Sequence, residues 1–403
     1  MKQHVNRYLF RLFGILWLLA VCPLSAVAAD EETEEQEWRE ELCQELDRLC
    51  ASPLFETTQL GLCVYDLTAD TMLYTVNARQ RMRPASTMKL LTSITALSVL
   101  GGSHTFQTTL YHTGAVNNRV LQGDLYVVGG FDPRFGKDDL YAFAEEVKLL
   151  GVDSIAGTLY ADVSFKDTLR WGEGWCWDDE AERLTPLLYQ GKDCFMEQFV
   201  RALGEQGIAS AGVTGQAVCP ADAFYITKRA HAIDQILMPM MKESDNLYAE
   251  SMFYQLAARS SVPYASARQA VNYIRTLIRE LGYDADQYRI ADGSGLSLYT
   301  YLTPELEVAF LRYAYQHNPI FTHLYTSLPI AGRDGTLKSR MKRGKAYKNV
   351  RAKTGSVSAV ASLAGYAQAS NDHMLAFCII NQGLVKLKSG RDFQDAVCEA
   401  LCR

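Results

Sequence analysis

The chain has 403 residues, of which 48% are hydrophobic and 21% are charged, as in globular proteins with two or three packed units. This composition excludes a disordered or fibrous protein. The formal net charge of -6 argues against a nucleic-acid partner, because binding to phosphates requires clusters of lysine and arginine.

Residues 1–29 have the pattern of a secretory signal peptide. A basic start, an apolar run and an A-x-A-type cleavage site follow one another, at Lys2, Arg7, Arg11, residues 12–24 and residues 26–28. The apolar run is shorter than the roughly 20 residues that a membrane-spanning helix needs. An alternative is a lipoprotein signal that ends at Cys22, but Val21 fits that motif poorly. We therefore expect an exported protein without a lipid anchor.

The cysteines and histidines show no metal-binding pattern. Nine cysteines remain beyond residue 29, and this odd number leaves at least one thiol without an intramolecular partner. There is no CxxC and no HExxH, so we expect neither a metal nor a cofactor. Cys43 and Cys50 share one side of a predicted helix, as do Cys398 and Cys402. A disulfide between these helices and a set of buried free thiols both remain open, and buried thiols are the more common arrangement.

The predicted elements begin with an amphipathic helix, followed by a hairpin of two strands and then by a buried helix. These elements occupy residues 38–49, 61–67, 71–77 and 86–97. Between residues 104 and 222 the chain changes to short strands, a tryptophan-rich segment and one helix at 194–208. The segments before and after this region share the same pattern of apolar helices. We therefore expect 104–222 to be a small inserted α+β accessory domain.

The part of the chain after the insertion is mainly helical from about Ala230 to Asn318. It closes with three strands and a last helix that begins near Arg391; the strands are at 349–358, 361–370 and 373–381. Consecutive strands with short connections predict an antiparallel sheet, which the first and last helices can cover. Residues 30–103 and 223–403 should therefore form one discontinuous domain.

Ser86 and Lys89 stand one turn apart on the predicted buried helix. A lysine beside an apolar face is costly unless its chemistry is used. Burial favours the neutral amine, which can take the proton of a serine hydroxyl and so activate a nucleophile. The pair alone is a weak signal, because Ser339 and Lys342 have the same spacing on a basic stretch. The spacing is explained equally well by a serine that caps the helix and a lysine whose side chain extends into solvent.

Two further motifs strengthen the catalytic interpretation. Ser244-Asp245-Asn246 and Lys353-Thr354-Gly355 each occur once, and the order SxxK, SxN, KTG is typical of penicillin-binding proteins and class A β-lactamases. We expect Ser244 to relay a proton between the Lys89 amine and the leaving group, and Asn246 to hold a substrate amide. The predicted catalytic residues are Ser86, Lys89, Ser244, Asn246 and Lys353.

The strand that carries KTG should bind the substrate. Lys353 can attract a carboxylate, and Thr354 can bind it. Gly355 on an edge strand permits close approach of the backbone, and the amides of Ser86 and Ser356 can form an oxyanion hole.

The sequence resembles the class C low-molecular-mass penicillin-binding proteins, the D-alanyl-D-alanine carboxypeptidase/endopeptidase family of the bacterial periplasm. The similarity runs from about residue 38 to the C-terminus and includes five ordered motifs: RPASTMKLLT, KESDNLYAE, ADGSGLS, PIAGRDGTL and AKTGS. It implies a periplasmic serine-type DD-peptidase that acts on peptidoglycan stem peptides through an acyl-enzyme. It also implies that β-lactams are covalent inhibitors that acylate Ser86.

The chain departs from this family in three places. The stretch after Trp177 leads almost directly into the helix at 194–208, where many family members carry a further β-rich segment. Leu298 stands where the family usually has arginine, and Val357-Ser358-Ala359 replaces its Leu-x-Gly. A preference for a diaminopimelate side chain therefore does not transfer to this chain. Asp132 matches a family aspartate near the amine of that side chain, although an Asp-Pro turn explains this residue nearly as well.

Three other functions share part of the motif set. A β-lactamase needs a carboxylate that drives deacylation, and Glu305 and Glu307 lie between SDN and KTG, but Thr303-Pro304-Glu305 reads as a helix start. A non-catalytic wall-binding protein would have no use for a desolvated lysine beside a serine. An esterase acting on small acyl esters would use the same nucleophile.

The expected fold is α/β, with a transpeptidase/β-lactamase-like domain and an inserted accessory domain. The first consists of an antiparallel sheet flanked by helices and a helical subdomain. The active site should lie between the helical part and the edge strand that carries KTG. The sequence predicts no oligomeric state.

Overall fold

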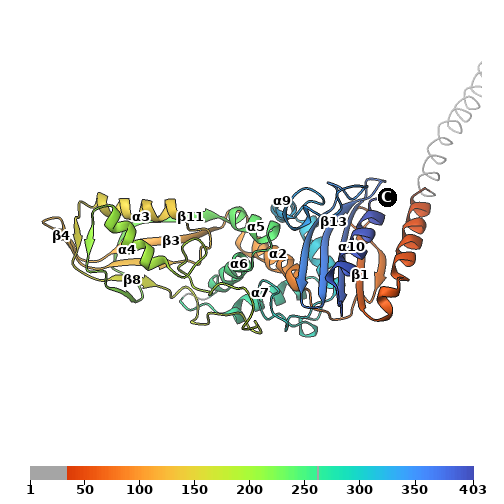
Figure 1. Ribbon diagram of the computed structural model, residues 1–403, viewed down its shortest axis with the longest axis horizontal. Coiled ribbons are helices and arrows are strands. Elements are labelled where there is room, and N and C mark those ends of the chain that lie inside the picture. Colours follow the sequence, from red (N-terminus) through yellow and green to blue (C-terminus); the bar gives the residue numbers. More distant parts are fainter. Residues whose placement is uncertain (1–33, 261–262) are drawn as a thin grey trace, which may run out of the picture.

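A computed structural model describes residues 34–260 and 263–403. The predicted signal peptide at 1–29 lies outside these residues. The molecule is elongated, with one sheet near each end and helices between them (Figure 1). No helix in the described ranges is long and apolar enough to cross a membrane.

The first sheet is antiparallel throughout and has the order β12-β13-β14-β1-β2. Its strands are β1 (Gln59–Asp66), β2 (Thr71–Val76), β12 (Arg351–Val357), β13 (Val360–Gln368) and β14 (Met374–Gln382). The predicted hairpin thus pairs with the last strand of the chain, since β1 lies along β14 over its whole length. The KTG motif lies on the edge strand β12, as expected.

Both faces of this sheet are buried, because alternate residues of each strand enter different cores. Leu62 and Val64 pack with helical residues 34–50 and with α10 (Leu387–Leu401), whereas Cys63 between them packs on the opposite face, against the helical part.

The last helix, α10, begins at Leu387, four residues before Arg391, where it was expected to start. Gly390 explains the error: it weakens the helix signal in the sequence, although it lies close to the sheet, where an added Cβ would be 3.3 Å from Asn381 Cβ.

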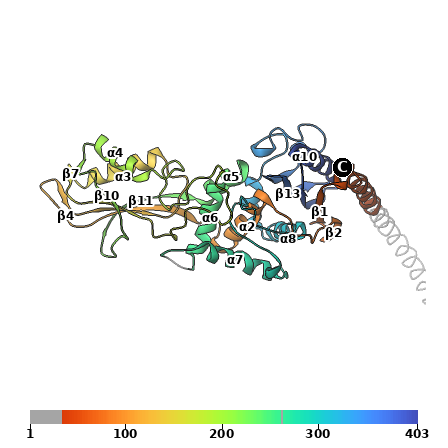
Figure 2. The same ribbon diagram turned by 60° about the horizontal axis from the view of Figure 1, so that its bottom comes forward.

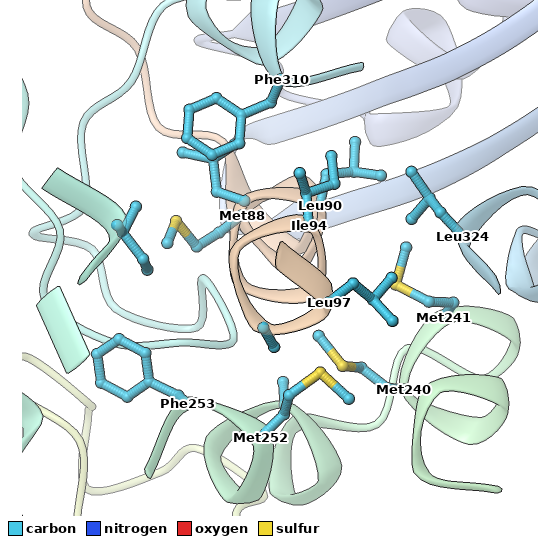
Figure 3. Close-up of a cluster of buried hydrophobic side chains, with 14 of the residues drawn as sticks. Met88, Leu90, Ile94, Leu97, Met240, Met241, Met252, Phe253, Phe310 and Leu324 are labelled. Atoms are coloured by element: carbon cyan, nitrogen blue, oxygen red, sulfur yellow. The ribbon is translucent and has the colours of Figure 1, made fainter. Parts of the chain in front are cut away.

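The helical part surrounds α2 (Met88–Leu100), whose first ten residues are all buried. Figure 3 shows Leu97 of this helix beside Met240 and Met241 of a neighbouring helix, and Leu90 and Ile94 on the side that faces Leu324. The surrounding helices are α5 (Ile233–Lys242), α6 (Asn246–Ala258), α7 (Ala267–Glu280), α8 (Pro304–Gln316) and α9 (Asn318–Ser327). Burial on all sides holds the N-terminus of α2 in a fixed place.

The accessory part contains a five-stranded mixed sheet with the order β10-β8-β6-β3-β11, covered by two helices (Figures 1 and 2). These elements are β3 (Thr105–His112), β6 (Leu125–Gly129), α3 (Lys137–Leu149), β8 (Leu159–Asp162), α4 (Phe195–Glu205), β10 (Thr214–Gln216) and β11 (Phe224–Ala232). A smaller sheet joins β4 (Ala115–Asn117), β5 (Val120–Gln122), β7 (Ser154–Ile155) and β9 (Ala209–Ser210).

Strand β11 lies beyond residue 222, the expected end of the insertion, yet it pairs with β3 from Phe224 to Ala232. The helical part accordingly resumes at Ile233, not at Ala230. We propose that the inserted unit extends from 104 to 232. The first and last strands of this unit along the chain, β3 and β11, connect it directly to α2 and α5.

A long loop of the insertion, residues 163–187, returns to the helical part. Lys166 pairs with Ala265 in an isolated parallel bridge, and its buried ammonium lies 4.7 Å from the ring centroid of Tyr254. Trp175 Nε1 donates a hydrogen bond to Asp292 Oδ2 at 2.9 Å. The insertion is therefore attached to the helical part through this loop as well as through β3 and β11.

All nine cysteines of the described residues are free thiols, four of them buried. Cys398 and Cys402 lie in the core between α10 and the sheet. No disulfide joins the two terminal helices over the described residues, but the alternative of buried thiols holds only for Cys398 and Cys402, since Cys43 and Cys50 are partly exposed.

Glu307 of α8 is fully buried below the N-terminus of α2. Its Oε1 accepts a hydrogen bond from Thr87 Oγ1 at 2.8 Å, and its Oε2 accepts one from Cys378 Sγ at 3.4 Å. Burial raises the pKa of Glu307 to about 7. The folded protein therefore retains a proton on this carboxyl at pH values where the unfolded chain has released it.

We expect Glu307→Gln to reduce the loss of stability at rising pH. Between the unfolded pKa near 4.5 and the folded pKa near 7, the native carboxyl loses up to about 3 kcal/mol of stabilisation, which an uncharged glutamine does not lose. Urea denaturation at pH 4.5 and pH 8 measures the difference. Glu305→Gln, on the surface of the same helix, is the control, and parallel pH dependences of Glu307→Gln and wild type would contradict the prediction.

Candidate active site

Ser86 lies in a 3-10 turn, Ala85–Thr87, that leads directly into α2. Ala85 has a φ of 50°, in the left-handed region that costs a residue with a side chain free energy. The turn is held closely from outside: a Cβ on Gly295 would lie 1.9 Å from the Ala85 carbonyl oxygen. Ser86 is thus presented from a tight, supported turn and remains partly exposed.

Lys89 is fully buried, and its ammonium has three hydrogen-bond acceptors. Its Nζ lies 3.0 Å from Ser86 Oγ, 2.7 Å from Asn246 Oδ1 and 2.9 Å from the Ser294 carbonyl oxygen. Burial lowers the pKa of Lys89 to about 8, although the carboxylates of Asp292 and Glu250 act in the opposite direction. An appreciable fraction of this amine is therefore neutral near pH 8 and can accept the proton of Ser86.

The loop that carries Ser294 is organised by two buried carboxylates. Glu250 accepts hydrogen bonds from the amides of Gly293 and Ser294, at 3.0 and 2.8 Å. Asp292 accepts bonds from the amides of Gly295 and Ser297. Burial, and then the charge of Asp292, raise the pKa of Glu250. These carboxylates fix the carbonyl that holds Lys89.

The SDN motif lies where α5 passes into α6. Asp245 caps α6 by accepting a bond from the Tyr248 amide at 3.2 Å, so Asn246 becomes the first residue of the helix. Ser244 has a φ of 63°, a turn that directs the motif back toward Lys89 and Lys353.

Lys353 of β12 is also fully buried. Its Nζ donates to Ser244 Oγ at 2.8 Å and to the Thr354 carbonyl oxygen at 2.6 Å. Burial, and then the charge of Lys89, hold the pKa of Lys353 well below its ordinary value. Ser244 was expected to exchange a proton with Lys89; in the described residues its hydroxyl is bound by Lys353 instead.

Gly355 brings β12 against the nucleophile turn. A Cβ at this residue would lie 2.1 Å from Ser362 Oγ, 2.8 Å from the Pro84 carbonyl oxygen and 2.9 Å from the Ser86 amide nitrogen. Only glycine permits this approach, which brings the backbone before Ser356 next to that of Ser86.

The outward side chains of β12 have partners as well. Thr354 Oγ1 bonds to Thr336 Oγ1 at 2.7 Å, and Thr336 belongs to the turn Gly335–Leu337 in the fourth sequence motif. Ser356 is exposed, and its Oγ accepts a hydrogen bond from Arg391 at 3.1 Å.

Asp132 lies apart from these residues, in the insertion. It is buried, and its carboxylate accepts bonds from His231 Nδ1 at 2.7 Å and from the Arg134 amide at 3.0 Å. The bond to Asp132 raises the pKa of His231. Asp132 thus makes the turn that was considered as its alternative role, and its side chain is occupied by a histidine.

A charged cavity of about 780 Å³ lies between the insertion and the start of α6. Asn246 and His231 both line it, together with cationic and anionic side chains of the insertion, among them Arg134, Asp139 and Lys192. It therefore connects the residues around Lys89 with the neighbourhood of Asp132, and it can accept a ligand that bears both signs of charge.

The structure brings together eight of the nine predicted site residues and leaves Asp132 outside the hydrogen-bonded group. Sequence reasoning did not assign roles to five residues that the structure places in or below the site, namely Glu250, Asp292, Ser294, Thr336 and Arg391. Four of them lie inside the motifs quoted above, and the sequence signal for them was therefore available: Glu250, Asp292, Ser294 and Thr336. Arg391 has none, because its place depends on how α10 packs against the sheet.

The carboxylates considered for a β-lactamase do not face the nucleophile. Glu305 pairs with Arg79 at 3.1 Å on the surface. Both oxygens of Glu307 are occupied by Thr87 and Cys378 in the core.

One group of metal-ligating side chains occurs in the described residues: Glu35, Asp66 and His373. It lies at the N-terminal helix, on the far side of the sheet from Ser86. Arg39 Nη2 lies 2.7 Å from Glu35 and 3.7 Å from Asp66, so a guanidinium already compensates these charges. The cluster therefore has the character of a structural ion-pair network.

Comparison with known proteins gives a consistent result. The chain is 27% identical over 440 residues to a D-alanyl-D-alanine carboxypeptidase of an Actinomadura species, covering 85% of this chain and 81% of that protein. It is 25% identical over 407 residues to the carboxypeptidase DacB of Haemophilus influenzae, covering 80% and 85%. The crystal structure of penicillin binding protein 4 from H. influenzae superimposes with a TM-score of 0.76 at 23% identity, over 86% of this chain and 96% of that one.

The fold is thus the transpeptidase-like fold that was expected. A predatory endopeptidase from Bdellovibrio bacteriovorus shares it more distantly, with a TM-score of 0.53 at 15% identity over 81% of this chain and 86% of that one. The D-Ala-D-Ala carboxypeptidase 3 (S13) family matches residues 42–187 and 187–402. Since the match covers nearly all of the described residues, the chain belongs to the D-Ala-D-Ala carboxypeptidase 3 (S13) family.

Proposed function

We propose that this chain is a serine DD-peptidase, which removes the terminal D-Ala of peptidoglycan stem peptides, cleaves D-Ala crosslinks, or does both. The observation that carries the proposal is the fully buried Lys89, whose Nζ lies 3.0 Å from the hydroxyl of a partly exposed serine. A protein that only binds the wall has no need for a desolvated amine in this position. Family membership and the relatives named as carboxypeptidases support the same reaction.

In acylation, Ser86 Oγ attacks the carbonyl carbon of the penultimate D-Ala, and its proton passes to Lys89 Nζ. The amides of Ser86 and Ser356 then stabilise the oxyanion, because Gly355 lets the two backbones approach. The proton that Lys89 accepted then passes through Ser244 Oγ to the leaving nitrogen, which leaves Lys89 neutral again, and Lys353 holds the Ser244 hydroxyl in place through their 2.8 Å bond. The acyl-serine forms as the C–N bond breaks, and the D-amino acid or the crosslinked peptide leaves.

In deacylation, water attacks the acyl-serine. Lys89 is the base closest to the ester oxygen. It takes the proton of the water and returns it to Ser86 Oγ as the ester C–O bond breaks and the shortened peptide leaves. Glu305 and Glu307 are bound elsewhere and supply no second base. A slow deacylation is consistent with a peptidase that β-lactams inhibit by acylating Ser86; a solved relative is described as complexed with a β-lactam.

Substrate recognition is assigned to β12 and to the charged cavity. Thr354 and Ser356 bind the carboxylate of the leaving residue, and Asn246 holds the amide of the stem peptide. The cavity receives the rest of the stem peptide. We also propose that residues 1–29 export the protein to the periplasm, where this substrate is found.

Treatment of the mature protein with defined muropeptides tests the reaction. We expect loss of one alanine from an uncrosslinked pentapeptide, splitting of a crosslinked dimer, or both, as read by mass spectrometry. Ser86→Ala should abolish product formation and labelling by a fluorescent penicillin. Labelling of the wild type without any peptide product would contradict the proposal in favour of an esterase or a vestigial binder.

The rate of acylation should rise with pH. Because Lys89 must be neutral to accept the proton of Ser86, and its pKa is lowered to about 8, kcat/KM should increase through that pH and then level off. Stopped-flow measurement of the rate of acylation by a β-lactam between pH 6 and 10 tests this rise. A rate that does not change between pH 6 and 9 would exclude Lys89 as the base.

Gly355→Ala should lower the acylation rate at least 100-fold, because the new Cβ meets two backbone atoms of the nucleophile turn closer than 3.0 Å. Gly204→Ala is the control, since nothing lies within 4 Å of a Cβ there. Penicillin acylation rates of both variants, with thermal melts, separate a site defect from unfolding. Equal rates in the two variants would show that this close approach is not needed.

A further inference from the structure

Arg391 is a cation without an anionic partner, and it lies beside the strand that carries KTG. Its side chain is exposed, and its Nη2 donates to Ser356 Oγ at 3.1 Å. The two carboxylates nearest to it in sequence, Asp392 and Asp395, are paired with other cations. Within residues 34–260 and 263–403, no carboxylate lies at salt-bridge distance from the Arg391 guanidinium.

The packing of α10 determines where this guanidinium lies. Ala361 of β13 is directly opposite Ser356 of β12, and a Cβ on Gly390 would lie 3.5 Å from Ala361 Cβ. The start of α10 thus lies in contact with the sheet, and the residue after Gly390 reaches Ser356. Over the described residues, Arg391 forms no ion pair along α10, so a pair that stabilises the helix does not account for this arginine.

The lysine of the KTG motif on β12 is poorly suited to capture an anion by itself. Lys353 is fully buried, its Nζ is engaged by Ser244 and by the Thr354 carbonyl, and its pKa is held well below the ordinary value by burial. Arg391 stays charged at every physiological pH and presents several donors in a planar fork, which matches a carboxylate.

We propose that Arg391 binds the carboxylate of the substrate's leaving residue, together with Thr354 and Ser356. The ligand is therefore a C-terminal carboxylate, or the equivalent carboxylate next to a crosslink. This inference rests on the proposed DD-peptidase function. In the free protein the guanidinium is held in place by Ser356 Oγ, and on binding it adds a charge-assisted bond to the carboxylate that β12 receives.

The test compares two thioesters of one N-acylated D-alanine, a thioglycolate, which has a carboxylate on the leaving group, and its methyl ester, which has none. We expect Arg391→Gln to lower kcat/KM about tenfold for the thioglycolate, mainly through KM, which corresponds to about 1.4 kcal/mol. The methyl ester should change less than twofold. Arg391→Lys should recover part of the loss, since it restores the charge but not the fork.

Lys388→Gln is the matched control, because it removes one exposed cation from the same turn of α10 and should change neither substrate. Equal losses of Arg391→Gln on both thioesters would show a merely structural role and overturn the proposal, as would no loss on either. Different results would contradict the DD-peptidase function and the role of Arg391. A wild type that leaves D-Ala-D-Ala peptides intact contradicts the DD-peptidase function, whereas the thioester pair decides on Arg391.

Discussion

The removal of the Lys89 ammonium from water is the constraint on which the rest of this site depends. A buried cation is tolerated only when it is fully hydrogen-bonded, and the fold supplies a serine hydroxyl, an asparagine oxygen and a backbone carbonyl from three separate segments. The same burial that makes the lysine costly lowers its pKa and makes it a base. The hydrophobic cluster around α2 therefore has a chemical as well as a structural role (Figure 3).

The residues that support the Lys89 site come from distant parts of the chain. Glu250 and Asp292 hold the loop whose carbonyl binds Lys89, and Asp292 also accepts a bond from Trp175 of the insertion. The insertion therefore contacts the same carboxylate that organises the site. Its charged cavity opens beside Asn246, so the insertion is placed to influence which stem peptides reach the nucleophile.

The fold was largely predictable, because its sheet and helices have strong periodic patterns. The boundaries that failed did so for local reasons. Strand β11 was missed because none of its residues is buried and Lys228, Arg229 and His231 interrupt any apolar pattern, so that only its pairing with β3 makes it a strand. The start of α10 was placed too late because Gly390 weakens the helix signal in the sequence, although it lies close to the sheet.

By itself the sequence determined the family and the reactive groups, because Ser86 and Lys89, the SDN motif and the KTG motif are local patterns whose spacing encodes their chemistry. Tertiary structure decided how these groups are connected. It bound Ser244 to Lys353, surrounded Asp132 with His231 and an amide, and brought Arg391 to Ser356. These contacts join residues far apart in the chain, so their partners depend on packing and cannot be deduced from spacing.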